Sequence, residues 1–246
     1  MSLSAILTEA FNFFRNNMKQ LFLLIFPISI LMSGIKFWLI SVLSVISDSV
    51  VAGEMDTVQI DTSLVIAALV YVVLLTILYA SLTLFLEVRS NGYEPKTSQV
   101  LLTSLNFVPG LLLAGVLSSL AIFGPYIILL TISPLLAILG IFTGIFLYIR
   151  LLFVNFMIVV ERLTPLEAIK RSFYFSSPIM LKTVAIVLLN IPIILVYSLA
   201  AKVIPDGILI IDIVTASLFT FFGLIIDVAL FRLYMVSRPN KVDEEA

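Results

Sequence analysis

Long apolar stretches separated by short polar segments dominate the pattern of this chain. A membrane-spanning helix needs about 20 mostly apolar residues, and six stretches meet that requirement: 20–46, 63–87, 99–123, 136–160, 183–204 and 207–232. The pattern predicts an all-α fold, a polytopic transmembrane helical bundle with six spans in three hairpins. We expect residues 1–246 to form a single integral membrane domain.

The third and fourth spans belong to one apolar region that contains Gly124, Pro125 and Pro134. From residue 126 to residue 160, a single helix would be about 52 Å long. The hydrocarbon core of a bilayer is only about 30 Å thick. We therefore expect residues 124–134 to form an apolar connector at the membrane interface, or a partly re-entrant one.

Two segments outside the spans have the spacing of amphipathic helices. In residues 3–19, apolar side chains such as Ile6, Ala10 and Phe14 recur at helical intervals, and Glu9 lies opposite them. A helix of this kind rests in the headgroup plane of a membrane. We expect residues 3–19 and 164–176 to be cytoplasmic interface helices that precede the first and the third hairpin.

The second of these segments, "TPLEAIKRSFYFSS" (164–177), begins with a helix-capping signal. Thr164 is a favourable N-cap, Pro165 suits the first helical position, and Glu167 completes a capping box. The sequence therefore predicts that a helix starts here, directly after the fourth span.

The apolar face of this segment is narrow. Leu166, Ile169 and Phe173 share one side, whereas Arg171 points away and Lys170 lies at the edge, where its stem can snorkel. The sequence predicts a surface helix that joins two spans.

Composition supports the membrane interpretation and limits the chemistry. Of the 246 residues, 61% are hydrophobic and only 12% are charged, whereas soluble domains have roughly 25% charged residues. A net charge of −1 offers no basic surface for nucleic acid, and the chain has neither cysteine nor histidine. These absences remove thiol nucleophiles, the most frequent general base and the most frequent metal ligands. We expect no catalytic, cofactor or metal site.

Lysine and arginine are distributed asymmetrically between the two sides of the predicted spans. Because cytoplasmic loops are rich in these residues, a cytoplasmic amino terminus places eleven of the 14 basic residues on that side, whereas residues 47–61 contain four acidic residues and no basic one. The pattern predicts that both termini are cytoplasmic. The eleven are Arg15, Lys19, Arg89, Lys96, Arg162, Lys170, Arg171, Lys182, Arg232, Arg238 and Lys241.

Three stretches resemble a family of uncharacterised bacterial inner-membrane proteins typified by enterobacterial YciC. They are "NFFRNN" (12–17), "TGIFLYIRLLFVNFMIVVERLTPLEAIKRSF" (143–173) and "LFRLYMVSR" (230–238). The central stretch is also similar, more loosely, to the membrane domain found beside some glycerophosphodiester phosphodiesterase domains. The resemblance implies a multi-pass protein of about 250 residues in the bacterial cell inner membrane, with six helices and no established activity.

Arg150 and Asp227 lie deep inside predicted spans, where an ionisable group is costly unless it is paired or hydrated. Arg150 lies about 15 Å from the cytoplasmic end of its helix, and Asp227 lies at a similar depth in the last span. An Arg150–Asp227 ion pair that fixes helix register is one interpretation. A polar site for an anionic lipid or solute is the other.

The fifth span contains a helix-breaking signal. Asn190 precedes Pro192, which has no N–H and weakens the helix one turn back. A kink of this kind serves packing in many membrane helices, but transporters also use broken helices to coordinate solutes. In the fourth span, Gly140 and Gly144 form a small-residue face that lets another helix approach closely.

Three classes of function remain. The first is a non-enzymatic envelope or lipid-associated membrane protein, whose partners are the phospholipid bilayer and an unidentified membrane or cytoplasmic protein. The alternative is a permease or channel subunit for a small solute or lipid, with residues 164–176 as a docking helix; Phe173 there replaces the glycine of the corresponding motif in transporter permeases. An intramembrane enzyme is the third class, and the missing nucleophile–base pair weighs against it.

Overall fold

The chain folds into helices throughout the part that the computed structural model describes, which is residues 1–51, 61–203 and 208–238. This confirms the all-α prediction. Six of the helical segments are long and apolar enough to cross a membrane. In chain order the helices are α1 (Leu3–Val51), α2 (Thr62–Ser90), α3 (Thr97–Ser104), a 3₁₀ turn (Leu105–Phe107), α4 (Val108–Ile132), α5 (Pro134–Leu151), α6 (Val154–Val160), α7 (Pro165–Phe175), α8 (Met180–Leu188), α9 (Asn190–Val203) and α10 (Leu209–Ser237).

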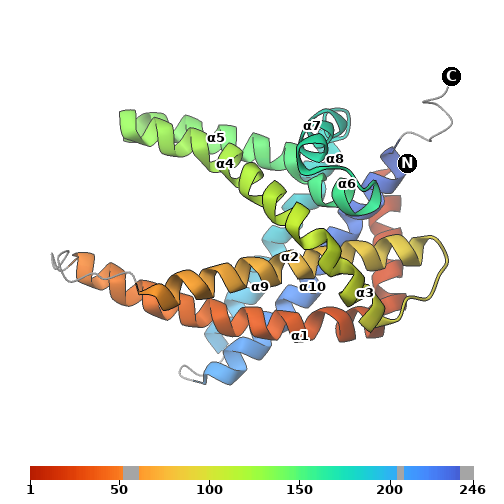
Figure 1. Ribbon diagram of the computed structural model, residues 1–246, viewed down its shortest axis with the longest axis horizontal. Coiled ribbons are helices and arrows are strands. Elements are labelled where there is room, and N and C mark those ends of the chain that lie inside the picture. Colours follow the sequence, from red (N-terminus) through yellow and green to blue (C-terminus); the bar gives the residue numbers. More distant parts are fainter. Residues whose placement is uncertain (52–60, 204–207, 239–246) are drawn as a thin grey trace.

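Residues 3–19 are not a helix separate from the first span, because α1 continues through them without interruption. No glycine or proline stands at the expected junction, so the backbone keeps its helical hydrogen bonds there. The first turns of α1 run at a steep angle to the rest of the helix (Figure 1). Their apolar face packs inward, with Ile6, Ala10 and Phe14 all buried.

The expected connector at 124–134 is wrong. Residues 124–132 belong to α4, which contains Pro125, and only Ser133 separates α4 from α5. Ser133 is extended, its hydroxyl accepts a hydrogen bond from the backbone N–H of Leu135, and Pro134 occupies the first position of α5. Serine at the N-cap followed by proline starts a helix efficiently, so one residue is enough to reverse the chain.

α4 and α5 pack closely because α5 presents glycine to α4. A Cβ atom on Gly140 would lie 2.5 Å from Tyr126 Cα, and one on Gly144 would lie 2.7 Å from the carbonyl oxygen of Ile122. Both distances are far shorter than van der Waals contact, so only glycine permits this approach. The small-residue face expected from the sequence therefore operates within the α4/α5 hairpin.

Three of the predicted spans are interrupted. In the third, the 3₁₀ turn Leu105–Phe107 separates α3 from α4. The fourth consists of α5 and α6, with a turn at residues 152–153, and the fifth consists of α8 and α9, with a turn at Leu189. The Leu189 interruption lies next to Asn190 and Pro192, as the helix-breaking signal predicts. Nothing in the sequence analysis anticipated the break after α5.

The buried core lies at one end of the bundle. Buried residues of α2 lie within 78–86, and those of α4 are limited to Leu111 and Ala114. Beyond these points most apolar side chains of α2, α4 and α5 are exposed. The α1/α2 hairpin and the α4/α5 hairpin diverge accordingly toward the other end (Figure 1).

Candidate functional site

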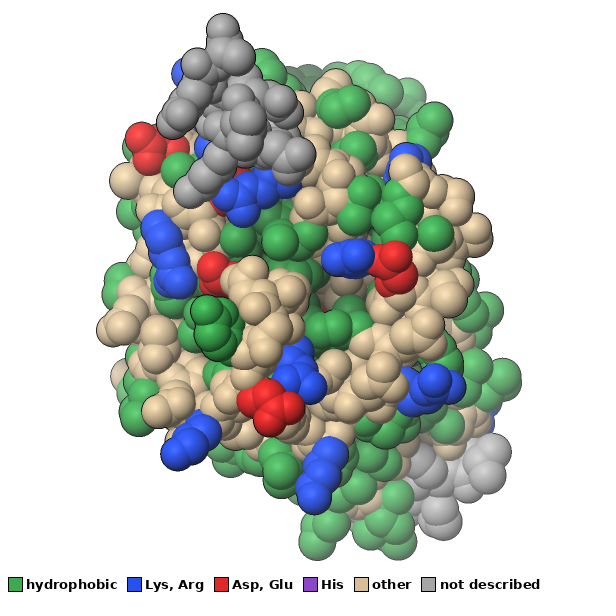
Figure 2. Space-filling view, turned by 90° about the vertical axis from the view of Figure 1, so that its right-hand side faces the viewer, with side chains coloured by type: hydrophobic (Ala, Val, Ile, Leu, Met, Phe, Trp, Pro, Cys, Tyr) green, Lys and Arg blue, Asp and Glu red, His purple; other side chains and the backbone are tan. Residues whose placement is uncertain are grey.

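The packed end of the bundle carries most of the arginine residues that the structure describes. Blue side chains are distributed over this face, with red ones beside several of them (Figure 2). We call it the basic end; Arg89, Arg162, Arg171, Arg232 and Arg238 lie there. It is the side that the sequence assigns to the cytoplasm.

Glu161 is the central residue of the basic end. Its side chain is only 6% exposed, and its carboxylate lies 2.9 Å from Arg171 Nη1 and 3.6 Å from Arg238 Nε. The fully buried Tyr234 donates its hydroxyl to the same carboxylate. One acid thus joins the end of α6 to α7 and to the end of α10.

Further ion pairs join other elements around Glu161. Arg162 Nη2 lies 3.6 Å from Glu87 at the end of α2, and its guanidinium stacks 4.4 Å from the centre of the Phe107 ring. Arg232 on α10 pairs with Glu9 in the first turns of α1. These contacts hold all three hairpins together at the basic end.

An aromatic layer lies next to Glu161, toward the membrane interior. Phe153 and Phe156 flank Tyr234, with ring centres 6.3 Å and 5.7 Å from it, and Phe156 meets Phe231 edge to face at 5.5 Å. Phe175 of α7 packs on the same tyrosine at 5.4 Å. These five rings fill the centre of the bundle between α6, α7 and α10.

Asp227 lies one helical turn beyond this layer. It shares a face of α10 with Phe231 and Tyr234, because residues four and seven positions apart project in the same direction. Its side chain is half-buried there.

Arg150 and Asp227 do not pair, which corrects one interpretation from the sequence. Arg150 Nη1 instead donates to the carbonyl oxygen of Phe173 at 3.1 Å, and the guanidinium lies 5.1 Å and 4.9 Å from the ring centres of Phe146 and Phe173. The turn that ends α5 also frees the carbonyl oxygen of Arg150, which accepts a hydrogen bond from Ser172 Oγ at 2.8 Å. A similar depth of Arg150 and Asp227 in the membrane does not mean that their side chains point toward each other.

α7 begins as the sequence predicts but packs through a different face. Ala168 and Ser172 are fully buried against the core, whereas Leu166 is 67% exposed. Ile169 and Phe173, which share a side with Leu166 in the sequence pattern, are half-buried, and the Ser172 hydroxyl donates to the carbonyl oxygen of Arg150 in α5. Lys170 is exposed, and Arg171 pairs with Glu161.

The capping box of α7 is present. The backbone N–H of Thr164 donates to Glu167 Oε2 at 3.1 Å, and the Thr164 hydroxyl donates to the same oxygen at 2.6 Å. The hydroxyl bond, followed by the backbone bond, holds the pKa of the Glu167 carboxyl below its ordinary value of 4.5.

We expect the start of α7 to loosen in acid. A lowered pKa in the folded protein means that Glu167 contributes stability above pH 4.5 and loses it as the pH falls through the lowered pKa. Thr164→Ala removes the hydroxyl donor, so the Glu167 pKa should rise toward its ordinary value. Carboxyl-detected NMR titration measures the Glu167 pKa in the wild type and in Thr164→Ala. An unchanged Glu167 pKa in Thr164→Ala would contradict the capping geometry.

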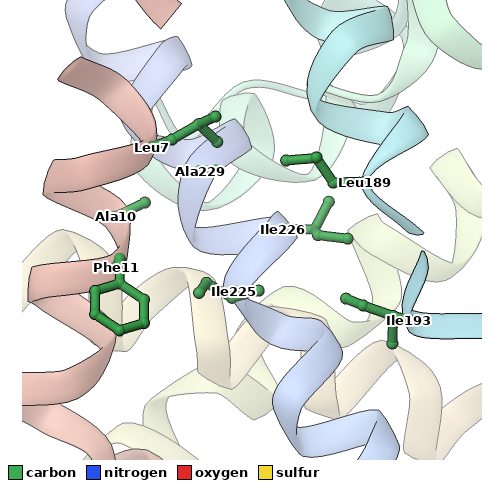
Figure 3. A pocket seen from close by; sticks show the side chains of 8 residues that line it. All are labelled: Leu7, Ala10, Phe11, Leu189, Ile193, Ile225, Ile226 and Ala229. Carbon is green, nitrogen blue, oxygen red and sulfur yellow. The ribbon is translucent and has the colours of Figure 1, made fainter. Parts of the chain in front are cut away.

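An apolar pocket lies where α8 meets α9. The amide of Asn190 donates to the carbonyl oxygen of Val187 at 3.1 Å, within the interruption, and Pro192 is exposed. Next to it, a cavity of 240 Å³ separates the first turns of α1 from α9 and α10 (Figure 3). We call it the α9/α10 pocket; it is lined by Leu7, Ala10, Phe11, Leu189, Ile193, Ile225, Ile226 and Ala229.

A second apolar cavity, of 450 Å³, follows the seam of the α4/α5 hairpin. Ile122, Phe123 and Tyr126 of α4 form one side of this α4/α5 groove. Gly140, Ile141, Gly144, Ile145 and Tyr148 of α5 form the other side. Tyr148 is the lining residue nearest to the end of α5 that joins the packed bundle.

No family model, no curated protein and no solved structure matches this chain. Within the described ranges, no three acidic side chains gather as a metal site would require.

Sequence reasoning missed Glu161 and Tyr234, which form the most connected polar contact in the described structure. Glu161 follows the fourth span directly and reads as an ordinary boundary charge, and Tyr234 reads as a membrane-interface aromatic. The only sequence signal for this contact combines three segments. Glu161 ends the fourth predicted span, and basic residues lie in two other segments that are predicted to be on the same side of the membrane.

Proposed function

We propose that this multi-pass membrane protein is a non-enzymatic lipid-associated protein of the bacterial inner membrane, with both termini cytoplasmic, and that it binds a phospholipid in the α9/α10 pocket. The observation that carries the proposal is the pocket itself. Its eight lining residues are all apolar, and three separate elements contribute them. Such a cavity suits an acyl chain because it offers no partner to a polar ligand.

A basic residue lies where the phosphate of such a lipid would be. Lys182 lies in the first turn of α8 and Leu189 follows the last residue of this helix, so the two are about 10 Å apart along the helix axis. Lys182 is exposed, and its amine donates to the carbonyl oxygen of Met1 at 3.2 Å. A lipid whose acyl chain fills the pocket would place an anionic headgroup beside this amine.

The proposed orientation is supported by charge. The basic end lies on the same side as Lys182 and the first turns of α1, and positive charge accumulates on the cytoplasmic side of inner-membrane proteins. The resemblance to the YciC-type family agrees with this localisation, and a lipid site here would lie in the cytoplasmic leaflet.

Filling the pocket should weaken lipid binding. In Leu189→Trp the indole would occupy the space of several methylene groups, each of which contributes about 0.8 kcal/mol when buried. We expect the affinity for phosphatidylglycerol, measured by native mass spectrometry of the purified protein, to fall about tenfold or more. Ile191→Trp is the matched control, because Ile191 is 52% exposed on the same helix and does not line the pocket.

The headgroup has its own test in the same assay. Lys182→Gln should lower the preference for phosphatidylglycerol over phosphatidylcholine about fivefold, since one basic residue near a lipid surface contributes about 1 kcal/mol. Lys170→Gln, also exposed, should leave that preference unchanged. Equal lipid binding by Leu189→Trp and Ile191→Trp would refute the pocket as the lipid site.

A permease subunit is the second candidate, favoured by one observation on α7. Leu166 and Tyr174 are each 67% exposed, and exposed apolar side chains on a charged face often mark a protein contact. Isolation of the complex in native lipid distinguishes the two functions. A stoichiometric ATPase partner would favour the permease, whereas retained phospholipid without such a partner favours the lipid-associated protein.

A further inference from the structure

Arg150 is a cation that forms no ion pair within the part of the chain that the structure describes. Its Nη1 donates to the carbonyl oxygen of Phe173 at 3.1 Å, whereas its Nε is buried without a hydrogen-bond partner among the described residues. The five arginine residues of the basic end, by contrast, all pair with a glutamate. An uncompensated charge in an apolar protein is costly, so an anion from outside the chain would stabilise Arg150.

Two phenylalanine rings fix the position of the Arg150 guanidinium. It lies 5.1 Å from the ring centre of Phe146 and 4.9 Å from that of Phe173, and the two rings meet edge to face at 6.3 Å. Stacking on aromatic rings engages the face of a guanidinium and leaves its planar fork of N–H donors for other groups. The side chain of Arg150 is half-buried, so it is not enclosed in the bundle.

Arg150 lies at the level of the polar helix α7. α5 ends at Leu151, directly after Arg150, and the carbonyl oxygen of Arg150 accepts a hydrogen bond from Ser172 Oγ at 2.8 Å. α7 also carries Lys170 and Arg171, and a helix with such charges stays at the surface of a membrane. Arg150 is therefore located where the apolar part of α5 meets the headgroup region.

The surface of α5 below Arg150 is apolar and exposed. Phe146 and Phe142, about one and two turns earlier in the helix, are 37% and 65% exposed, and α5 contains no other charged residue. Phe142 is about 12 Å from Arg150 along the helix axis. A single positive charge above an apolar surface is complementary to a phospholipid, which has a negative phosphate above an acyl chain.

We propose that Arg150 binds the phosphate of an anionic phospholipid in the leaflet on the side of the basic end, with an acyl chain along Phe146 and Phe142. Arginine matches phosphate oxygens with paired N–H donors, and basic sites between membrane helices bind anionic headgroups. The site is formed by α5 and α7 and shares no residue with the lining of the α9/α10 pocket. It does not rest on lipid binding there.

The test measures lipid selectivity beside Arg150 by fluorescence quenching. The chain has a single tryptophan, Trp38, so Trp38→Phe combined with Phe142→Trp gives a full-length reporter whose only indole is two turns from Arg150. The reporter is reconstituted in vesicles of phosphatidylglycerol and phosphatidylcholine, in which one lipid carries brominated acyl chains that quench tryptophan on contact. Phosphatidylglycerol should be preferred about fivefold, the effect of one basic residue near a lipid surface.

Two substitutions of Arg150 separate its charge from its packing. In the reporter, Arg150→Gln should abolish the preference for phosphatidylglycerol, whereas Arg150→Lys keeps the charge and should retain the preference within about twofold. Both substitutions remove the stacked guanidinium, and both keep the backbone carbonyl that accepts from Ser172. A change in packing would therefore affect the two variants equally.

A second reporter position keeps the proposal testable if Arg150→Gln does not fold. Gly140 lies against Tyr126 and Gly144 against Ile122, so Phe123 of α4 is at nearly the same depth as Phe142. Phe123 is 59% exposed and lines the α4/α5 groove, which has no basic residue in its lining. With Phe123→Trp in place of Phe142→Trp, and Arg150 intact, phosphatidylglycerol should have no preference.

A soluble phosphate ester shares the chemistry of the lipid phosphate, and competition distinguishes the two. Excess glycerol phosphate should leave the quenching unchanged, and its removal of the preference would overturn the lipid assignment. The proposal is also overturned by equal preferences in the reporter and its Arg150→Gln variant, by equal loss in Arg150→Gln and Arg150→Lys, or by equal preferences at the two tryptophan positions. None of these variants alters the α9/α10 pocket, whose test remains Leu189→Trp.

Discussion

Replacing Glu161 by alanine should lower the free energy of unfolding by about 3–5 kcal/mol, the cost of removing one partner from a buried ion pair. The Glu161 side chain is 6% exposed, forms ion pairs with Arg171 and Arg238, and accepts a hydrogen bond from Tyr234. Without it, the fully buried Tyr234 hydroxyl loses its acceptor, and the guanidinium groups of Arg171 and Arg238 lose this carboxylate. Since these partners belong to α7 and α10, the loss separates elements that are far apart in the sequence.

The measurement is an unfolding titration in mixed micelles with increasing sodium dodecyl sulphate, followed by circular dichroism. Glu94→Ala is the control, because Glu94 is 77% exposed and pairs with Arg89 at 3.1 Å. An exposed pair of this kind contributes about 0–1 kcal/mol. If Glu161→Ala and Glu94→Ala lower the free energy of unfolding equally, Glu161 is not the residue that joins the helices at the basic end.

Gly140→Ala should produce the second large loss of stability, about 1–3 kcal/mol or more, as expected for a side chain forced into a well-packed contact. The added Cβ would lie 2.5 Å from Tyr126 Cα and 2.9 Å from the carbonyl oxygen of Pro125. Both are backbone atoms, so the neighbour cannot move by a simple rotation. The α4/α5 hairpin must open, and the groove along its seam should change shape with it.

Gly115→Ala provides the matched control for this glycine. It lies in α4, and nothing stands within 4 Å of a Cβ added there. Alanine favours a helix over glycine by about 1 kcal/mol, so this variant should be neutral or more stable in the same titration. Equal effects of Gly140→Ala and Gly115→Ala would show that helix propensity, not close packing, governs the hairpin.

The sequence predicted the candidate site unevenly. Arg150 and Asp227 can be identified from the sequence because a charged residue inside an apolar span stands out in the linear pattern. The interruption near Asn190 and Pro192 is also predictable, because proline disrupts the hydrogen bonds of its own helix. Their partners were not recognised. The direction of a side chain depends on the rotation of its helix, and a turn at residues 152–153 changed that rotation for α5 and α6.

Errors in the predicted elements have the same origin. The sequence predicts a connector that includes residues 124–132, because the apolar region is too long for one straight membrane-spanning helix. In the structure, these residues are helical and the chain reverses at Ser133 alone. Residues 3–19 were separated from the first span because their amphipathic pattern differs from it, although the backbone continues through both. The acidic segment at 47–61 falls mostly outside the described residues, as do Lys241 and the residues around it.

By itself, the sequence determined the helical class, the six spans, the cap of α7 and the small-residue face of Gly140 and Gly144, since each follows from composition or from residues a few positions apart in the chain. Only the tertiary structure decided that Glu161 binds Arg171, Arg238 and Tyr234, and that Arg150 donates to the carbonyl oxygen of Phe173 rather than pairing with Asp227. These pairings join helices that are distant in the chain. They depend on how three hairpins rotate and pack at one end, which no local pattern encodes.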